Sequence, residues 1–245
     1  MSLPNRLLVL FAVLLAACQP QKDAPLTLPT PQLWQVSYPP ALDWLEPALN
    51  GCTLLTPGRG LVVNEAPYSS LKPGESDIVL SWGGGETWQG YTVVLGFDDL
   101  VVIVNSQNSQ PALTATQLKQ IFMGEIKSWG EVASDSPNEQ KIEVWDYPPG
   151  NEIRSTLSSI LGVSSHNPEA MFAPEPKAML QAVSSNPNAI GYVPRRWVNE
   201  SVIIIPVEGS EALAKQPILA NTSIEPDEPL RNWLVCLQQS IRGGN

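Results

Sequence analysis

The most informative part of the chain reads LTATQLKQIFMGEIKSWGEV, residues 113–132. Thr114 followed by Gln117 three residues later forms a capping box, which predicts a helix that runs from Thr114 to Phe122. The large apolar side chains of Phe122, Ile126 and Trp129 are expected in the core rather than in contact with a ligand.

Strands and helices alternate on both sides of this stretch. We predict strands at 33–37, 60–64, 77–81, 91–95, 100–105, 141–145, 190–193 and 202–206, and helices at 39–49, 114–122, 151–161, 176–184 and near the C-terminus. This alternation favours an α/β protein with parallel sheets covered by helices on both faces.

The N-terminal segment has Arg6 near its start and an apolar run at residues 7–17, too short to span a bilayer. We therefore predict a secretory signal at residues 1–17. Residues 15–18, LAAC, resemble the bacterial lipoprotein site, which implies lipidation of Cys18 and an extracytoplasmic protein anchored to a membrane, in a periplasm or on a cell surface. The alternative is an ordinary signal peptide with Cys18 unmodified.

Residues 18–32 contain four prolines and little that could be buried, so we interpret them as an extended tether. The fold is expected to begin near Leu33. The residues that follow suffice for one large domain or two small ones.

Composition narrows the classes of partner. The chain has 14 basic and 24 acidic residues, and its net charge of −10 disfavours nucleic acid. The negative charge does not exclude an anionic ligand, because helix N-termini supply a local positive potential. We expect a monomer.

The chain has three cysteines and one histidine, His166. With Cys18 assigned to lipid, Cys52 and Cys236 form either a disulfide or two buried thiols. Cysteines and histidine show no metal-ligand spacing, and we expect no metal and no cofactor. No nucleophile elbow or carboxylate pair stands out, so an enzyme is disfavoured.

The stretch at 113–132 resembles the phosphate-binding proteins of ABC transporters. Three further segments carry the same resemblance: DLVVIVN at 99–105, PNAIGYV at 187–193 and DIVLS at 77–81. Tyr192, in the second of these segments, is expected in the core.

This resemblance implies a two-lobe type II periplasmic-binding-protein fold with a ligand cleft between the lobes. Lobe one would take residues 33–97 and 200–245, lobe two residues 98–199, and Cys52 and Cys236 would then share a lobe. The implied function is capture of a small ligand, phosphate or a related oxyanion, for delivery to an ABC permease.

The resemblance also implies ligand contacts. Where the family has a Gly-Ser-Gly-Thr-Arg turn, this chain has GNEIR at residues 150–154, so Asn151 and Arg154 are candidate ligand residues. Strand ends and helix N-termini meet at the cleft of this fold, which adds Ser37 and Ser81. Alternatively, Ser37 caps a helix, and Arg154 pairs with Glu152 or Asp146.

Three residues depart from the family pattern. Trp82 stands where the phosphate binders have an aspartate, Glu152 adds a negative charge, and Ile153 lacks a hydroxyl. Trp82 also opens the segment WGGGETW at 82–88, which we interpret as a loop at the rim of the cleft or as a surface turn with packed indoles. These departures favour a second hypothesis, in which the fold serves as a sensor or a surface interaction module.

Overall fold

The computed structural model describes residues 30–72, 74–83, 88–108, 112–132, 140–213 and 215–243. The predicted signal, Cys18, the tether as far as residue 29 and residues 84–87 of the WGGGETW loop lie outside the described residues. Residues 31–245 belong to one compact unit.

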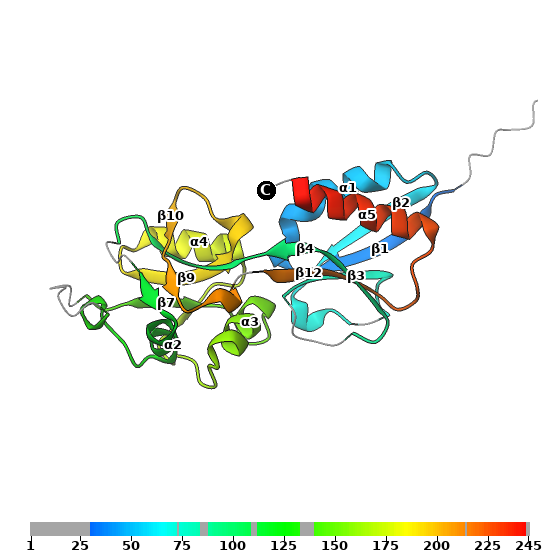
Figure 1. Ribbon diagram of the computed structural model, residues 1–245. Coiled ribbons are helices and arrows are strands. Elements are labelled where there is room, and N and C mark those ends of the chain that lie inside the picture. The colour runs from blue at the N-terminus through cyan, green and yellow to red at the C-terminus, as the bar shows by residue number, and fades with distance from the viewer. Residues whose placement is uncertain are drawn as a thin grey trace, which may run out of the picture. The chain divides into compact units, whose positions relative to one another are not determined.

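The first sheet has the strand order β2-β1-β3-β12-β4 (Figure 1). β1 pairs in parallel with β2 and β3, whereas β12 runs antiparallel to both β3 and β4. The bounds are β1 Gln32–Tyr38, β2 Arg59–Glu65, β3 Ile78–Trp82, β4 Tyr91–Asp98 and β12 Gln216–Thr222.

Helices α1 and α5 lie on one side of this sheet (Figure 1). A disulfide between Cys52 and Cys236 joins them, and the indole Nε1 of Trp233 donates a hydrogen bond of 3.0 Å to Thr53 Oγ1. The first sheet with these helices is called the first lobe below. Its helical bounds are η1 Pro40–Leu45, η2 Tyr68–Ser70, α1 Glu46–Leu54 and α5 Glu228–Gly243.

The second sheet has the order β10-β5-β9-β7-β8. β7 pairs in parallel with β8 and β9, and β5 runs antiparallel to β9 and β10. Every residue of β5 and β9 is buried. The bounds are β5 Leu100–Asn105, β7 Glu143–Asp146, β8 Met171–Phe172, β9 Ala189–Pro194 and β10 Val202–Ile204.

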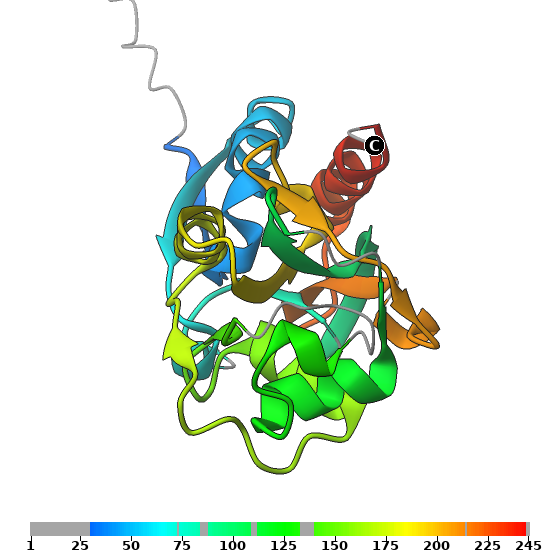
Figure 2. The same ribbon diagram turned by 90° about the vertical axis from the view of Figure 1, so that its left-hand side faces the viewer.

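Helix α4 covers one side of the second sheet, and α2 lies on the other side (Figure 2). This sheet with its helices is the second lobe. The remaining bounds are α2 Ala115–Met123, α3 Glu152–Leu161, α4 Pro176–Ser185, η3 Trp129–Glu131, η4 Arg195–Trp197, η5 Glu211–Leu213, and the paired short strands β6 Leu113–Thr114 and β11 Val207–Glu208.

The capping box that predicted α2 is confirmed. Thr114 Oγ1 accepts from the Gln117 amide at 3.1 Å, and Gln117 Oε1 accepts from the Thr114 amide at 2.9 Å. Phe122, Trp129 and Tyr192 are buried, as expected, and the rings of Phe122 and Tyr192 meet edge to face. Ile126, also expected in the core, is only half-buried and packs against it.

Two expectations about the architecture were wrong. Both sheets are mixed rather than parallel: β12 runs antiparallel to β4, and β5 runs antiparallel to β9. Parallel neighbours need a crossover connection, usually a helix. β4 continues almost directly into β5, and β12 returns to the first sheet without such a helix. The chain also returns to the first lobe later than residue 200, where we expected it. β10 still pairs with β5, and the first sheet resumes only at β12.

Among the described residues, no helix combines the length and the apolar character that a membrane span requires.

Candidate functional site

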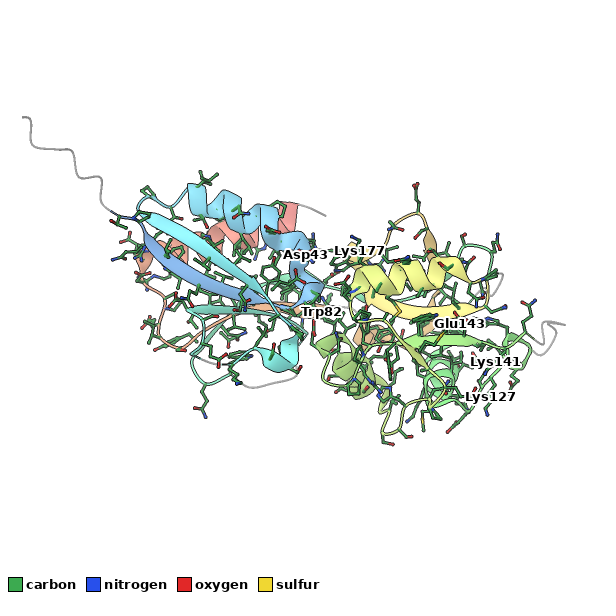
Figure 3. The ribbon with its side chains drawn as sticks, turned by 180° about the vertical axis from the view of Figure 1, so that it is seen from behind. Asp43, Trp82, Lys127, Lys141, Glu143 and Lys177 are labelled. Atoms are coloured by element: carbon green, nitrogen blue, oxygen red, sulfur yellow. A yellow bond between two sulfur atoms is a disulfide. The ribbon has the colours of Figure 1, made fainter. Side chains whose placement is uncertain are left out.

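A cavity of about 550 Å³ lies where the end of β3 meets helix α3. Figure 3 shows Trp82 at the end of β3, and this residue is one of those that line the cavity. Both lobes contribute to the lining. The lining residues are Tyr68, Ser69, Trp82 and Gln216 from the first lobe, with Gly150, Glu152, Ser155, Thr156, Ser159 and Ile160 from the second.

Two close approaches join the lobes at this cavity. A Cβ added to Gly83 would lie 2.6 Å from Thr156 Oγ1, and one added to Gly150 would lie 3.2 Å from the Cβ of Ser69. Gly83 and Gly150 have φ of 79° and 84°, a region that favours glycine. Glycine at both positions therefore permits these turns and leaves room for the Thr156 and Ser69 side chains of the other lobe.

Helix α3 begins with a cap made by its own sequence. Asn151 Oδ1 accepts hydrogen bonds from the amides of Ile153 at 2.9 Å and Arg154 at 3.3 Å. Such N-terminal amides bind anions in many proteins. Here the Asn151 side chain already occupies two of them.

Glu152 follows this cap and lines the cavity, although only 4% of the residue is exposed. Neither side-chain oxygen has a hydrogen-bond partner in another described residue. Burial raises the pKa of Glu152 to about 7, against a smaller lowering by its own backbone N–H. Glu152 therefore contributes a carboxyl group that is partly protonated at neutral pH and whose two oxygens are enclosed behind the cavity wall.

Arg154 does not line the cavity. Its Nε lies 3.3 Å from Asp146 Oδ2, and its Nη1 donates to the Tyr147 carbonyl at 2.9 Å. His166 Nδ1 lies 2.8 Å from the same Asp146 oxygen, and the Tyr192 hydroxyl donates to Asp146 Oδ1. Burial, followed by the Asp146 charge, raises the pKa of Tyr192 well above its usual range.

Ser37 and Ser81 are buried at two other places. Ser37 Oγ lies 2.6 Å from Ser76 Oγ, accepts from Asn64 Nδ2 at 3.3 Å and borders a separate cavity of about 240 Å³. Ser81 Oγ accepts from Asn221 Nδ2 at 3.2 Å. Ser37 and Ser81 thus have separate hydrogen-bond partners, and Ser37, Ser81, Asn151 and Arg154 are not among the residues that line the cavity at α3.

After burial itself, nearby carboxylates raise the pKa values of two buried tyrosines, Tyr147 and Tyr38. Burial, followed by Glu152, Asp146 and Glu175, raises the pKa of Tyr147 well above its usual range. In the first lobe, Tyr38 has a pKa of about 12, raised by burial and then by Glu46, Asp43 and Glu65. Glu175 also acts on Glu65, whose pKa is raised first by burial and then by Asp43, so carboxylates of both lobes act on one region.

Among the cavity-lining residues of α3, Glu152 stood out in the sequence, whereas the others were missed, although a signal was present. Glu152, Ser155, Thr156 and Ser159 follow the spacing i, i+3, i+4, i+7, which places polar side chains on one helix face. Tyr68 and Ser69 are neighbours in sequence but carry no comparable pattern, and Gln216 lies far from them along the chain.

The described residues contain no group of three or more His, Cys, Asp or Glu side chains placed to hold a metal ion.

The sequence matches a family model described as PBP superfamily domain over residues 82–230. Solved structures show the same fold. An ABC-type phosphate transport receptor from Vibrio cholerae is 22% identical, with a TM-score of 0.68 over 86% of this chain and 96% of that protein.

A putative phosphate ABC transporter substrate-binding protein from Clostridium perfringens, solved with bound phosphate, is 18% identical, with a TM-score of 0.69 over 84% of this chain and 93% of that one. A reduced form of OxyR from N. meningitidis is 19% identical, with a TM-score of 0.61 over 85% and 95%. The chain belongs to the PBP superfamily, and its described residues have the two-lobe α/β fold of periplasmic binding proteins.

Proposed function

We propose that this protein is an extracytoplasmic solute-binding protein, anchored to a membrane through lipid on Cys18, that captures a small solute between its lobes and presents it to an ABC permease. The observation that carries the proposal is the cavity of about 550 Å³, whose walls come from both lobes. Its volume falls in the range of small-molecule sites. A solute held there would contact both lobes and favour their closed arrangement.

Phosphate or a related oxyanion is the first candidate solute, because two proteins of the same fold are phosphate receptors. Ser37, Ser81, Asn151 and Arg154 are the contacts that this candidate requires. Each of them is engaged within the chain, by Ser76, Asn221, the α3 amides and Asp146 respectively. Phosphate binding would therefore require these side chains to exchange partners.

A sensor or surface interaction module is the second candidate function. The observation that favours it is Trp82, whose side chain is 1% exposed and occupies the wall of the cavity where the phosphate binders have an aspartate. In this case the fold would be kept while solute capture is lost. Under both functions we propose a monomer without catalytic activity.

Thermal unfolding of the full chain in detergent separates these functions. The panel of solutes is phosphate, sulfate, molybdate, sugars and amino acids. Intrinsic tryptophan fluorescence reports the unfolding of the protein. A solute present at a hundredfold excess over its Kd stabilises the folded state by about 2.7 kcal/mol, which raises Tm by roughly 5 to 10 °C at this size. A rise with one solute class supports solute binding; no rise with any compound favours the sensor or interaction module.

A further inference from the structure

The most exposed large apolar side chains of the described residues lie at one end of the first lobe. Leu54, Leu55 and Ile224 are 87%, 77% and 77% exposed, more than any other large apolar residue of the described part of the chain. Leu33 follows at 59%. Single exposed apolar side chains are ordinary on a protein surface, whereas several at one place mark an interaction site.

A hydrogen bond and an ion pair join three segments at this end. The amide of Gln32, at the start of β1, donates to the carbonyl of Gly58, in the turn between α1 and β2, at 3.0 Å. Arg59, which follows Gly58, forms an ion pair of 3.2 Å with Asp227, in the loop between β12 and α5. Figure 1 shows this turn, this loop and the start of β1 at the same end of the first lobe. We call the apolar side chains of these segments the tip surface: Leu33, Leu54, Leu55 and Ile224.

Leu54 and Leu55 are exposed on a turn whose backbone is fixed on both sides. Cys52 and Thr53, immediately before them, are buried, and the disulfide of Cys52 joins this turn to α5. Thr56, immediately after them, is also buried and donates to the Cys52 carbonyl at 3.0 Å. The two leucines therefore project outward from an ordered backbone, so that little backbone entropy is lost when a partner covers them.

The charges beside the tip surface nearly cancel. Arg59 pairs with Asp227, and Arg231 lies 4.0 Å from Glu225. Glu228, in the first turn of α5, adds one negative charge, which the helix dipole favours. A surface without net positive charge is not drawn to anionic headgroups, so the attraction of the tip surface to a partner is hydrophobic.

The polypeptide connects the first lobe to its predicted lipid anchor from the same end. β1 begins at Gln32, and Cys18 precedes Pro31 by 13 residues. A chain of this length spans at most about 45 Å, so a protein anchored through Cys18 keeps the start of β1 within that distance of the bilayer. The tip surface is thus held near the membrane at a high effective concentration, at which a weak contact suffices.

We infer that the tip surface contacts the lipid bilayer, with its four side chains at the boundary between headgroups and acyl chains. The inference rests on the proposed function, since it requires the lipid anchor at Cys18. The contact gives the protein a second point of attachment besides the acyl chains. It restricts rotation about the tether and holds the cavity at α3 in a defined orientation to the membrane.

The test uses the acylated full chain reconstituted in vesicles of zwitterionic phosphatidylcholine. A nitroxide label on Ile224→Cys reports contact with lipid. The label reacts with this cysteine because Cys52 and Cys236 form a disulfide and the thiol of Cys18 is acylated in this preparation. The control is Gln181→Cys, at an exposed position of α4. We expect the Ile224 label to collide more with oxygen, which is enriched in lipid, and less with an aqueous nickel chelate than the control label does.

Polar substitutions assign the contact to the leucines. With the Ile224 label in place, Leu54→Ser and Leu55→Ser together should lower the ratio of membrane-bound to free tips by roughly 10- to 100-fold, because two apolar side chains lose their contact with lipid. The matched control is the pair Phe97→Ser and Met171→Ser, which removes exposed apolar side chains from β4 and β8. The control pair should leave the accessibility of the label unchanged.

An Ile224 label as accessible to the nickel chelate as the Gln181 label would overturn the inference. The anchor of the proposed function would then still stand, because flotation with the vesicles measures anchoring separately. Accessibility that the two leucine substitutions leave unchanged would also overturn the inference.

Other occupants of the tip surface give different results, each of which overturns the inference. Protection of the Ile224 label that grows with the protein-to-lipid ratio would show pairing of two copies. Protection in native membranes but not in phosphatidylcholine vesicles would show a protein partner. If mass spectrometry finds Cys18 unmodified, the lipid anchor and the inference both fail, whereas solute binding is still decided by the change in Tm.

Discussion

The Nε of Arg154 lies 3.3 Å from Oδ2 of Asp146, and the side chains of the two residues are 12% and 1% exposed. This contact neutralises the cation that the family resemblance assigned to the ligand. Glu152 is then the one ionisable residue of α3 that lines the cavity, although both of its carboxyl oxygens are enclosed. The pair therefore holds the Arg154 side chain away from the residues that line the cavity.

Arg154→Ala should lower the free energy of unfolding by about 3 to 5 kcal/mol, because Asp146 would remain buried with one partner removed. Urea unfolding at pH 7 measures the loss. Arg195→Ala is the matched control, since Arg195 pairs with Asp99 at exposed positions and should cost less than about 1 kcal/mol. A small loss of stability together with a large loss of solute affinity would show instead that Arg154 contacts the solute.

Stability should fall as pH rises from about 4.5 to about 7. The folded-state pKa of Glu152 is raised above its value of 4.5, so the folded state binds more protons than the unfolded state in this range. The fall attributable to Glu152 is on the order of 3 kcal/mol. Asp98, whose pKa burial raises to about 6, acts in the same direction from about pH 4.

The variant Glu152→Gln separates the contributions of Glu152 and Asp98 to the pH dependence. It should flatten the decline in the free energy of unfolding between pH 6 and pH 7 and leave the part of the decline that is due to Asp98. Urea unfolding at half-unit pH intervals measures both profiles. Identical profiles for the wild type and Glu152→Gln would mean that the carboxyl is solvated and ionised.

Gly83→Ala should weaken solute binding as well as stability. The added Cβ would lie 2.6 Å from Thr156 Oγ1, so the Thr156 side chain or the turn at Gly83 must shift at the cavity. Gly74→Ala is the control, since Gly74 has φ of 84° but no atom within 4 Å of an added Cβ. Both variants should lose about 1 kcal/mol of stability from backbone strain. Equal solute affinities in the two variants would show that the Gly83–Thr156 contact does not affect binding.

Reduction of the Cys52–Cys236 disulfide should lower the free energy of unfolding by about 2 to 5 kcal/mol, because the bond closes a loop across 184 residues. Thermal unfolding with and without a phosphine reductant measures the change. The double variant Cys52→Ser, Cys236→Ser should match the reduced wild type. Two free thiols in the unreduced, denatured protein would contradict the disulfide.

Much of the fold could be predicted from the sequence, because its signals are local. The capping box at Thr114 and Gln117 predicted α2, and the apolar run at 100–105 coincides with β5. The mixed sheets were missed, because strand direction depends on where the chain crosses between the lobes. Nothing near residue 200 indicates that β10 pairs with β5, almost one hundred residues earlier.

The site was harder to predict, for a different reason. The family resemblance placed Glu152 and Trp82 at the ligand site as departures from the family pattern, and both residues line one cavity, but the sequence does not reveal how deeply the two side chains are buried. The pairing of Arg154 with Asp146 was one of two alternatives left open, and the choice between them required coordinates. Tyr68 and Gln216 reach the cavity through tertiary packing, which leaves no local trace.

Blocking the cavity tests the central claim, that solute binds between α3 and Trp82, most directly. Ser159→Trp places a large side chain into the lining, whereas Ser164→Trp places it at an exposed position outside the lining. The measurement is the rise in Tm caused by the most stabilising solute of the panel. We expect the rise in the wild type and in Ser164→Trp and none in Ser159→Trp; an equal rise in all three proteins would place the binding site elsewhere and contradict the account.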